Sequence, residues 1–488
     1  MYEAWVGSGE GRARRVKVLA TLGPASATLS AVCELAEAGA DAFRLNTSHL
    51  APAQVAPLVG LVRQAEAKLG RPLGVLVDLA GPKLRVGKGQ QLLTLSEGAV
   101  VALGGEGSGA SVLVEGADLS AACQVGSRVL LHDGRVVLAV RSCGVGLVQA
   151  EVLQGGAVTP GMGVNLPDAE TSLPALTPRD LACLAAAIAA ETEVVALSFV
   201  RQASDVGELQ ARLETAGWRA AVVAKLEKRQ AVAPPVLEAI LAVSDAVLVA
   251  RGDLGAETSP EAVPVLQKGI LAAARAAGVP AIVATELLES MREGTRPTRA
   301  EADDVANAVF DGADALLLTA ETAIGAHPAL AVATAARIAG EAERFPQYRA
   351  SWSAESDTLT GGDALPGAAA AGAVRIAEQL AADAIVCFTA SGRTARLVAR
   401  YRPTRPVLAL TPHPRVARAL TMVWGVEPQL CSEYPAEHEA VVALAARYAA
   451  ARGLVGGGGT LVVTHGAPGG SGAPTNLVRI HRVGAMQP

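Results

Sequence analysis

Aromatic side chains are scarce in this 488-residue sequence, where Phe, Trp and Tyr together make up 3% of the residues. Surfaces that bind single-stranded nucleic acid combine basic residues with aromatic side chains on which bases stack. The chain also lacks a broad cationic field, because acidic and basic residues are interspersed and the net charge is -5. We therefore expect no nucleic acid partner.

Long apolar runs and cysteine pairs are missing as well. No unbroken apolar run reaches the ~18 residues that a membrane-spanning helix needs, and the segment 1–15 contains no apolar stretch typical of a signal peptide. The six cysteines are far apart and form no C-x-x-C pair, which argues against zinc ribbons and disulfide frameworks. These absences predict a cytoplasmic protein that does not bind a membrane.

What the sequence does contain is a regular alternation of apolar strand patterns with helical patterns. Eight of the strand patterns end on polar residues, and they cover 15–23, 41–49, 73–85, 194–201, 221–227, 246–253, 280–286 and 315–321. Eight parallel strands separated by helices predict an α/β fold, a closed (β/α)8 TIM barrel whose active face lies at the C-terminal ends of the strands.

Two further regions break this rhythm. Short Val-rich segments with frequent glycines predict an all-β lid domain over 87–163, inserted between the barrel segments 1–86 and 164–350. A polar stretch over 351–363 predicts a linker. Beyond it, renewed alternation predicts a C-terminal α/β regulatory domain over 364–488.

The predicted barrel brings several polar side chains to one mouth. Lys225 and Glu227 are two residues apart on a strand and therefore point to the same side, and Asp253 ends the next strand. Two carboxylates and an ammonium suit a divalent metal with a phosphate or carboxylate substrate, whereas an internal ion pair in a packed barrel is the structural alternative. The convergence of strand ends favours a catalytic site, to which we assign Arg44, Asn46, Asp78, Ser198, Lys225, Glu227, Asp253 and Thr285.

The C-terminal region contains one segment whose residues could bind a ligand, T-A-S-G-R-T at 389–394. It lies between a predicted strand and a predicted helix, where backbone N–H groups, hydroxyls and an arginine can bind an anion. Ordinary capping of the helix by Ser or Thr is the alternative.

Eight segments of the chain resemble the pyruvate kinase family and occur in that family's order. They are K-V-L-A-T-L-G-P-A-S, F-R-L-N-T-S-H, V-D-L-A-G-P-K-L-R, G-V-N-L-P, S-F-V-R-Q-A-S-D-V, V-A-R-G-D-L-G-A-E, V-A-T-E-L-L-E-S-M and R-P-T-R-A-E-A-D-D-V-A-N-A-V-F-D-G-A-D. A single G-D-L-G is weak evidence, but eight co-linear matches are specific. The resemblance implies phosphoryl transfer from phosphoenolpyruvate to ADP, which gives pyruvate and ATP.

The resemblance also implies a role for each matching residue. Glu227 and Asp253 match the Mg²⁺ ligands, with Mn²⁺ as a substitute ion, and the catalytic residues are Lys225, Arg44 and Thr285. The substrate-binding residues are Arg44, Ser198, Lys225, Gly252, Asp253 and Thr285. The nucleotide ADP or ATP is assigned to Asn46, Thr47, Ser48, His49 and Arg85.

Lys83 is a departure that bears on monovalent cations. The family's K⁺ site is represented by Asn46, Ser48 and Asp78, but Lys83 stands where K⁺-dependent members have Glu. A fixed ammonium can supply the positive charge that a bound K⁺ provides, so we expect activity without K⁺.

Other departures leave two alternative functions open. Met162 replaces a nucleotide-binding lysine, Glu286 stands where Gln is usual, and 319–321 reads Thr-Ala-Glu in place of Ser-Gly-Glu. One alternative is another Mg²⁺-dependent barrel enzyme, such as a C–C lyase. The other alternative is a non-catalytic regulatory relative.

The 389–394 segment resembles the family's effector loop, so the resemblance implies allosteric activation by a phosphorylated ligand. Ala390 stands where some members have Lys, which favours a sugar monophosphate or AMP over a bisphosphate. The effector phosphate is assigned to Thr389, Ser391, Gly392, Arg393 and Thr394. A homotetramer is the oligomer that the resemblance implies.

Overall fold

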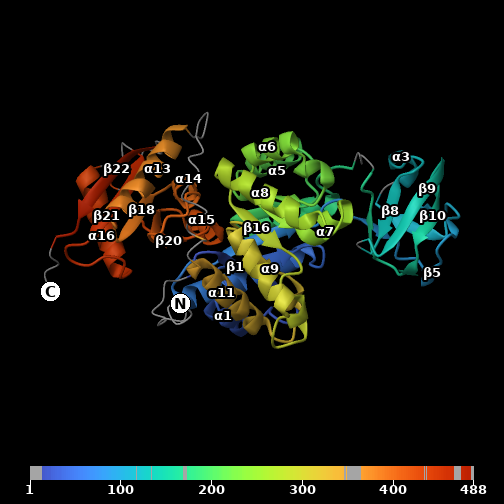
Figure 1. The fold of residues 1–488 in the computed structure, drawn as a ribbon, viewed down its shortest axis with the longest axis horizontal. Helices are drawn as coiled ribbons and strands as arrows, with labels where there is room; N and C mark the ends of the chain where they lie inside the picture. The colour runs from blue at the N-terminus through green and yellow to red at the C-terminus, as the bar shows by residue number, and fades with distance from the viewer. Residues whose placement is uncertain are drawn as a thin grey trace.

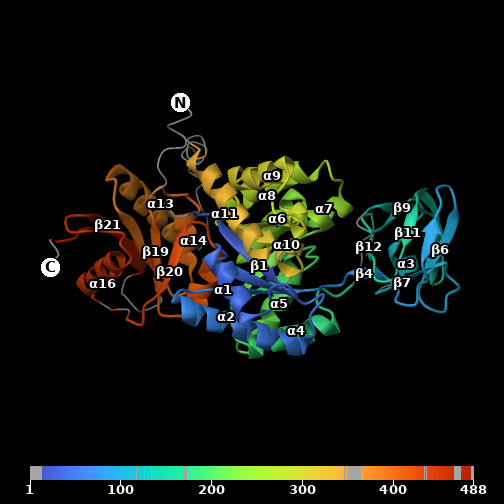
Figure 2. The same cartoon turned by 90° about the horizontal axis from the view of Figure 1, so that it is seen from below.

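A computed structural model describes residues 14–116, 118–132, 134–168, 173–345, 348, 364–433, 435, 437–466 and 474–484. Three bodies follow one another along its longest axis, with the central barrel between an inserted β unit and a C-terminal α/β unit (Figures 1 and 2). Within these ranges no helix is both long enough and apolar enough to cross a membrane. The linker predicted at 351–363 lies outside the described residues.

The central body is a closed barrel of eight parallel strands in the order β1-β17-β16-β15-β14-β13-β3-β2, which confirms the predicted fold. The strands are β1 (Lys17–Leu22), β2 (Ala42–Asn46), β3 (Gly74–Leu79), β13 (Val194–Leu197), β14 (Ala221–Leu226), β15 (Ala246–Ala250), β16 (Ala281–Ala284) and β17 (Ala315–Leu318). Alternate residues such as Leu76, Val223 and Ile282 point inward and share one fully buried cluster. The barrel is therefore packed with side chains, and open polar space is confined to its ends.

Helices surround the barrel in the expected alternation (Figure 2). Thr177 shows how the sequence sets one start, since its hydroxyl accepts from the Asp180 N–H, the Asp180 carboxylate accepts from the Thr177 N–H, and Pro178 opens the helix. The helices are α1 (Leu29–Glu37), η1 (Pro52–Gln54), α2 (Val55–Leu69), α4 (Pro178–Ala189), α5 (Ala203–Thr215), η2 (Arg229–Val232), α6 (Pro234–Val243), α7 (Arg251–Glu257), α8 (Val263–Ala277), η3 (Glu289–Arg292), α9 (Arg299–Phe310), α10 (Ala320–Ala323) and α11 (Pro328–Arg344).

The inserted unit follows β3, so it lies at the C-terminal ends of the barrel strands. Seven of its strands close a second barrel in the order β10-β6-β7-β4-β12-β8-β9, and β11 pairs with β5 separately. Its elements are β4 (Leu84–Val86), β5 (Leu93–Leu95), β6 (Val100–Gly104), β7 (Val112–Glu115), α3 (Leu119–Ala122), β8 (Arg128–Leu131), β9 (Val136–Gly144), β10 (Leu147–Gln154), β11 (Gly156–Val158) and β12 (Gly163–Asn165). Because β4 and β12 pair with each other, the two connections to the central barrel are tied together where they enter the insert.

The C-terminal unit has a five-stranded sheet in the order β20-β19-β18-β21-β22, in which only the β21–β22 pairing is antiparallel. The residues of β18 alternate between two cores, with Ile385 facing α13, α14 and α15 and Val386 facing α16. The elements are α13 (Ala364–Gln379), β18 (Ala384–Phe388), α14 (Arg393–Ala399), β19 (Val407–Thr411), α15 (Pro414–Ala419), η5 (Leu420–Met422), β20 (Val426–Leu430), α16 (His438–Ala451), β21 (Thr460–Gly466) and β22 (Thr475–Arg482).

The C-terminal unit docks on the N-terminal ends of the barrel strands. Arg402 is 2% exposed and donates to both carboxylate oxygens of Asp314, at 2.9 and 3.2 Å, just before β17. The Lys17 ammonium at the start of β1 donates to the Val426 carbonyl at 2.9 Å. Met422 joins the cluster of inward-facing barrel residues, so the C-terminal unit closes this end of the barrel.

Glu193 is a fully buried carboxylate at the same end of the barrel, directly before β13. It pairs with the Arg63 guanidinium at 2.5 Å and accepts from the Val75 N–H. Burial raises its pKa further than these two contacts lower it, to about 7. Glu193 therefore changes charge near neutral pH.

We expect the contribution of Glu193 to stability to be complete below pH 4.5 and to be lost as the pH rises to about 7. The folded state binds this proton more tightly than the unfolded state, so its loss should cost on the order of 1–3 kcal/mol. Urea unfolding midpoints measured from pH 5 to 8 should fall less steeply in Glu193→Gln than in the unaltered protein. Glu214→Gln, at an exposed position, is the matched control, and equal slopes in all three proteins would contradict the assignment.

Candidate active site

Lys225 is the centre of a polar cluster at the C-terminal mouth of the central barrel. It lies near the end of β14, and its ammonium contacts acceptors from three strand ends: Ser198 Oγ at 2.7 Å, Glu227 Oε1 at 2.9 Å and Asp78 Oδ1 at 3.2 Å. Adjacent parallel strands place these residues side by side, as the sequence predicted. The Lys225 side chain is 9% exposed and therefore largely shielded from solvent.

Asp78 links Lys225 to Arg44. The Asp78 carboxylate accepts from Arg44 Nε at 2.7 Å and lies 2.6 Å from Nη2, and Arg44 Nη1 reaches the Thr21 hydroxyl at 3.4 Å. Arg44 is more exposed than its partner, with 12% of its side chain accessible compared with 1% for Asp78. The buried carboxylate therefore orients a guanidinium that can still meet a ligand.

The protonation states of this cluster follow from a competition between burial and charge. Burial alone would raise the pKa of Asp78, but the charges of Lys225 and Arg44 outweigh it and lower the pKa. Burial alone would lower the pKa of Lys225, and the charges of Asp78 and Glu227 raise it instead. At neutral pH Asp78 is a carboxylate and Lys225 is an ammonium.

Glu227 and Asp253 supply the two carboxylates predicted for a metal ion. Burial raises the pKa of Glu227, Lys225 lowers it, and the nearby charge of Asp253 raises it again. Two carboxylates close enough to repel each other fit a divalent cation. Within the described ranges no group of three His, Cys, Asp or Glu residues is arranged to hold a metal. An ion here would therefore use two carboxylates and complete its shell with substrate oxygens and water, as Mg²⁺ does.

Lys83 takes part in this arrangement directly. Its ammonium lies 2.6 Å from Asp253 Oδ1, and both side chains are about one-fifth exposed, at 21% and 22%. The same ammonium lies 5.8 Å from the centre of the Phe199 ring. Phe199 in turn donates its N–H to Glu227 Oε2 at 2.6 Å. The Lys83 ammonium therefore forms an ion pair with Asp253, one of the two candidate metal ligands.

The apolar run predicted as a strand over 246–253 ends at Ala250, and α7 begins at Arg251. Gly252 and Asp253 thus lie in the first turn of a short helix. The Gly252 N–H donates to the Thr285 hydroxyl at 2.9 Å, which joins two predicted substrate contacts.

Arg251 is a supporting residue that the sequence analysis missed. Its side chain is 9% exposed, pairs with Asp304 at 2.7 Å and donates to the carbonyls of Thr285 and Glu286 at 2.6 and 3.0 Å. Both of those residues have positive φ, 71° and 53°, a strained conformation for non-glycine residues. Arg251 therefore stabilises the turn that presents Thr285. Its position between the end of a strand and a glycine was the feature of the sequence that could have indicated this role.

Four of the predicted nucleotide-binding residues, 46–49, lie at the end of β2 and in the loop that follows it. Thr47 donates its N–H and hydroxyl to the Asp78 carbonyl at 3.0 and 2.9 Å, and the Ser48 N–H donates to Asn46 Oδ1 at 3.1 Å. Arg179, which the sequence analysis did not select, donates to the Thr47 carbonyl at 3.1 Å. This loop is therefore held by hydrogen bonds to β3, to the Asn46 side chain and from Arg179.

The lowered pKa of His49 indicates positive charge around this loop. Burial lowers the pKa of His49, and the charges of Arg85, Arg44 and Arg179 lower it further. Arg85 lies on β4 and donates to the Gly161 carbonyl at 3.0 Å, so it belongs to the inserted unit. Three arginines beside a neutral imidazole suit a phosphate-bearing ligand.

The other residues that depart from the family's motifs, at 162, 286 and 319–321, also have defined positions. The Met162 sulfur accepts from the Thr159 N–H at 3.3 Å, and Glu286 is exposed. Glu321 is fully buried, and its carboxylate accepts from the Thr319 N–H at 2.7 Å and the Leu288 N–H at 3.1 Å. Glu321 therefore has a structural role beside the Thr285 turn.

The 389–394 segment connects β18 to α14, as predicted. The Gly392 N–H donates to the Thr389 hydroxyl at 2.9 Å, and the Thr394 hydroxyl lies 2.5 Å from the Thr475 hydroxyl. Ser391 and Arg393 are exposed. Part of the segment is thus used in internal contacts, whereas Ser391 and Arg393 lie at the surface.

Comparison with known proteins agrees with this geometry. A family model described as "Pyruvate kinase, barrel domain" matches residues 13–332, and one described as "Pyruvate kinase, alpha/beta domain" matches residues 367–481. The chain is 39% identical to a pyruvate kinase of Methylorubrum extorquens, with 96% of this chain and 97% of the relative covered. It is 40% identical to a pyruvate kinase of Mycobacterium tuberculosis, with 96% and 99% covered. It is 38% identical to pyruvate kinase 2 of Synechocystis, with 97% and 80% covered. By these matches over nearly its whole length, the chain belongs to the pyruvate kinase family.

Proposed function

We propose that this protein catalyses the Mg²⁺-dependent transfer of a phosphoryl group from phosphoenolpyruvate to ADP, which gives pyruvate and ATP. The observation that supports this proposal best is the buried Lys225 ammonium, held by Asp78, Ser198 and Glu227 at the mouth of the barrel. A fixed cation in a partly dry site stabilises negative charge on a phosphoryl group more strongly than it could in water.

Each neighbouring residue then has a defined task. Arg44, oriented by Asp78, binds the phosphate of phosphoenolpyruvate, and Lys225 stays beside the phosphoryl group during transfer. Bound to Glu227 and Asp253, Mg²⁺ would neutralise charge on the substrate oxygens. Mn²⁺, with the same preference for oxygen ligands, is a substitute.

The Thr285 turn positions the other end of the substrate. We assign the substrate carboxylate to the backbone N–H groups of Gly252 and Asp253, where the Gly252 N–H would be shared with the Thr285 hydroxyl to which it donates, and we place this hydroxyl by the enolate that becomes protonated. Since this hydroxyl accepts from the Gly252 N–H, its own proton remains available for donation. Ser198 completes the substrate contacts through Lys225.

ADP is proposed to bind between the loop after β2 and the inserted unit. Asn46, Thr47, Ser48 and His49 form the barrel side, and Arg85 reaches the phosphates from β4. The inserted unit would act as the lid that excludes water during transfer. Met162 cannot pair with a phosphate, so we expect this contact to be missing.

Lys225→Met should lower kcat for pyruvate formation by about 100-fold to 1,000-fold, the usual effect of removing one group that stabilises the transition state. The KM for phosphoenolpyruvate should change far less, because Arg44 still binds the phosphate. The assay couples pyruvate to lactate dehydrogenase, with Mg²⁺ and with ADP present or omitted. Exposed Lys268→Met is the matched control, and circular dichroism checks folding.

Three outcomes of this assay would contradict the proposal. An unchanged kcat in Lys225→Met would remove the role of the ammonium. Pyruvate formation from phosphoenolpyruvate without ADP would indicate hydrolysis of the phosphate ester in place of transfer to ADP. The absence of pyruvate from the unaltered protein would favour a C–C lyase or a non-catalytic relative.

We further propose that Lys83 makes the enzyme independent of K⁺. The cluster contains three cations and three carboxylates, namely Arg44, Lys83, Lys225, Asp78, Glu227 and Asp253. A glutamate at position 83 would change this balance by two negative charges. A bound K⁺ would restore half of that difference, in line with the K⁺ dependence that the resemblance implies for members with glutamate at this position.

Lys83→Glu should make activity dependent on K⁺, with kcat/KM for phosphoenolpyruvate rising roughly tenfold or more when K⁺ is added. The comparison is made in KCl and in tetramethylammonium chloride at equal ionic strength. Lys88→Glu, an exposed lysine five residues further along, is the control and should behave like the unaltered protein. A strict requirement for K⁺ in the unaltered protein would refute the proposal.

We also propose that a sugar monophosphate or AMP activates the enzyme, as a homotetramer, by binding its phosphate at 389–394. The exposed Ser391 and Arg393 and the start of α14 support this proposal. Titration of each ligand should shift the phosphoenolpyruvate saturation curve to lower concentrations. Arg393→Ala should abolish the shift and exposed Arg375→Ala should retain it, while no shift with any ligand would contradict regulation at this loop.

A further inference from the structure

Glu257 is a buried carboxylate that lies outside the cluster around Lys225. It is the last residue of α7 and its side chain is 2% exposed. Its Oε1 atom accepts from the Lys228 ammonium at 2.7 Å and from the side-chain N–H of Asn165 at 3.0 Å. Figures 1 and 2 show α7 at the end of the central barrel that faces the inserted unit. One carboxylate oxygen thus joins three segments of the chain.

Two of these segments carry the candidate metal ligands. Lys228 directly follows Glu227, and Glu257 lies four residues after Asp253, one turn further along α7. Residues four apart on a helix lie on the same face. The ion pair between Lys228 and Glu257 therefore cross-links the same two segments that a metal ion bound to Glu227 and Asp253 would cross-link.

This ion pair opposes a repulsion between the two candidate ligands. Burial raises the pKa of Glu227, the charge of Lys225 lowers it, and the charge of Asp253 raises it again, so the two carboxylates repel each other. A contact that draws the flanking residues together resists that repulsion. The Lys228 side chain is 15% exposed, so the pair is better shielded than an ordinary surface ion pair and holds its geometry more firmly.

The third segment is the connection by which the inserted unit returns to the barrel. Asn165 is the last residue of β12 and is 3% exposed. Within the described residues its amide oxygen is buried without a hydrogen-bond partner, so the bond to Glu257 is the contact that orients this amide. Because β12 pairs with β4, the other connection, a contact on Asn165 acts on both connections of the insert.

A cavity of about 20 Å³ lies among these residues. Lys228 and Asn165 line it together with Lys83 and Phe199, the residues that contact the two candidate metal ligands. It has room for about one water molecule, too little for a substrate or an effector. The contacts of Glu257 therefore hold chain segments in place and form no binding site of their own.

We propose that Glu257 and Lys228 are positioning residues that hold the two candidate metal ligands at the separation a divalent cation requires, and that Asn165 ties the inserted unit to the same helix. This inference rests on the proposed function, since it takes Glu227 and Asp253 as the metal ligands. The two residues act through the segments that they join, so their loss should weaken metal binding more than it slows turnover.

Lys228→Met should raise the Kd for Mn²⁺ about 10-fold to 100-fold, the usual effect of removing a residue that supports a metal ligand. Electron paramagnetic resonance measures free Mn²⁺ without substrate, so no turnover enters the result, and Glu227→Gln identifies the ion at this site. Lys228→Arg, which keeps the charge, should recover most of the affinity. Lys268→Met is the matched control, because Lys268 pairs with Asp311 on the outer helices and should leave the Kd unchanged.

Glu257→Gln should raise the Kd for Mn²⁺ to a similar extent. The double variant with Lys228→Met should bind Mn²⁺ no more weakly than either single variant, because the two residues act as one pair. In all three variants the Mg²⁺ concentration for half-maximal activity should rise by a larger factor than kcat at saturating Mg²⁺ falls. This difference separates positioning from direct contact with the transferred group.

Amide hydrogen exchange tests the contact with the inserted unit. Mg²⁺ should slow exchange over 163–165 in the unaltered protein, because the ion fixes α7 and α7 holds Asn165. Asn165→Ala should remove this slowing. The Kd for Mn²⁺ should rise less in Asn165→Ala than in Lys228→Met, since the ion pair is retained.

Three results would overturn the inference. The first is an equal Kd for Mn²⁺ in Lys228→Met and the unaltered protein, and the second is exchange over 163–165 that does not respond to Mg²⁺. The third is Mn²⁺ binding that survives Glu227→Gln. A Kd that responds to Lys228→Met in a protein that forms no pyruvate would uphold the positioning and refute the proposed function. Circular dichroism of each variant establishes folding.

Discussion

The buried ammonium of Lys225 is the constraint on which the catalytic end of this barrel depends. Taking a lysine out of water is costly, and the cost is offset only when its acceptors are held in good geometry. Here the acceptors come from β3, β13 and β14, so the barrel must close with these strands in one register for the charge to be tolerated. Arg44 then follows from Asp78, because the same carboxylate serves both cations. The acceptors that compensate the buried ammonium therefore also hold the side chains of the site in position before a substrate binds.

The position of Lys83 would place it in competition with a metal ion. Its ammonium lies 2.6 Å from Asp253, one of the two candidate metal ligands, so a divalent cation bound there would have to share or displace that contact. Lys83 directly precedes β4, the strand through which the inserted unit connects to the barrel. The position of its charge therefore depends on how the inserted unit is held. A metal ion bound to Asp253 would therefore be linked to the position of the insert through the Lys83 side chain.

The barrel could be predicted from the sequence because its strands are apolar runs that end on polar residues, and the meeting of Asp78, Ser198, Lys225 and Glu227 follows from strand order. Other features had weaker signals. Residues 251–253 directly follow an apolar run and were predicted as part of its strand. In the structure they form a helix turn, which Gly252 and the contacts of Arg251 allow. The sequence analysis did not predict β20, because the proline in V-E-P-Q-L argues against a strand. The Lys83–Asp253 contact joins residues 170 positions apart, and no local pattern encodes it.

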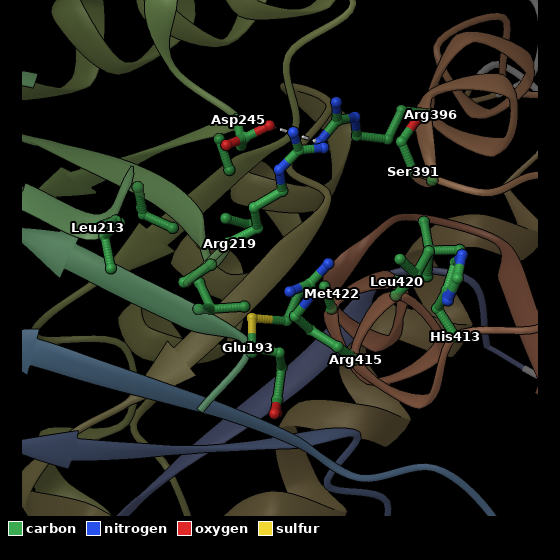
Figure 3. Close-up of a pocket in the computed structure, with 18 of the residues that line it drawn as sticks. Glu193, Leu213, Arg219, Asp245, Ser391, Arg396, His413, Arg415, Leu420 and Met422 are labelled. Carbon is green, nitrogen blue, oxygen red and sulfur yellow. Dashed lines mark hydrogen bonds and ion pairs between the residues drawn. The ribbon is translucent and has the colours of Figure 1, made fainter. Parts of the chain in front are cut away.

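The two ends of the barrel are closer than the separation of the outer units suggests. Val194 lines the cavity between the starts of the barrel strands and the C-terminal unit, which Figure 3 shows. Ser198, four residues further along the chain, contacts Lys225. At a rise of about 3.3 Å per residue this is a distance of roughly 13 Å, filled by side chains at the density of a protein core. Met422 of the C-terminal unit is part of that filling. The C-terminal unit is therefore packed against the same core that lies beneath the catalytic layer, and this core provides the shortest route between the two ends.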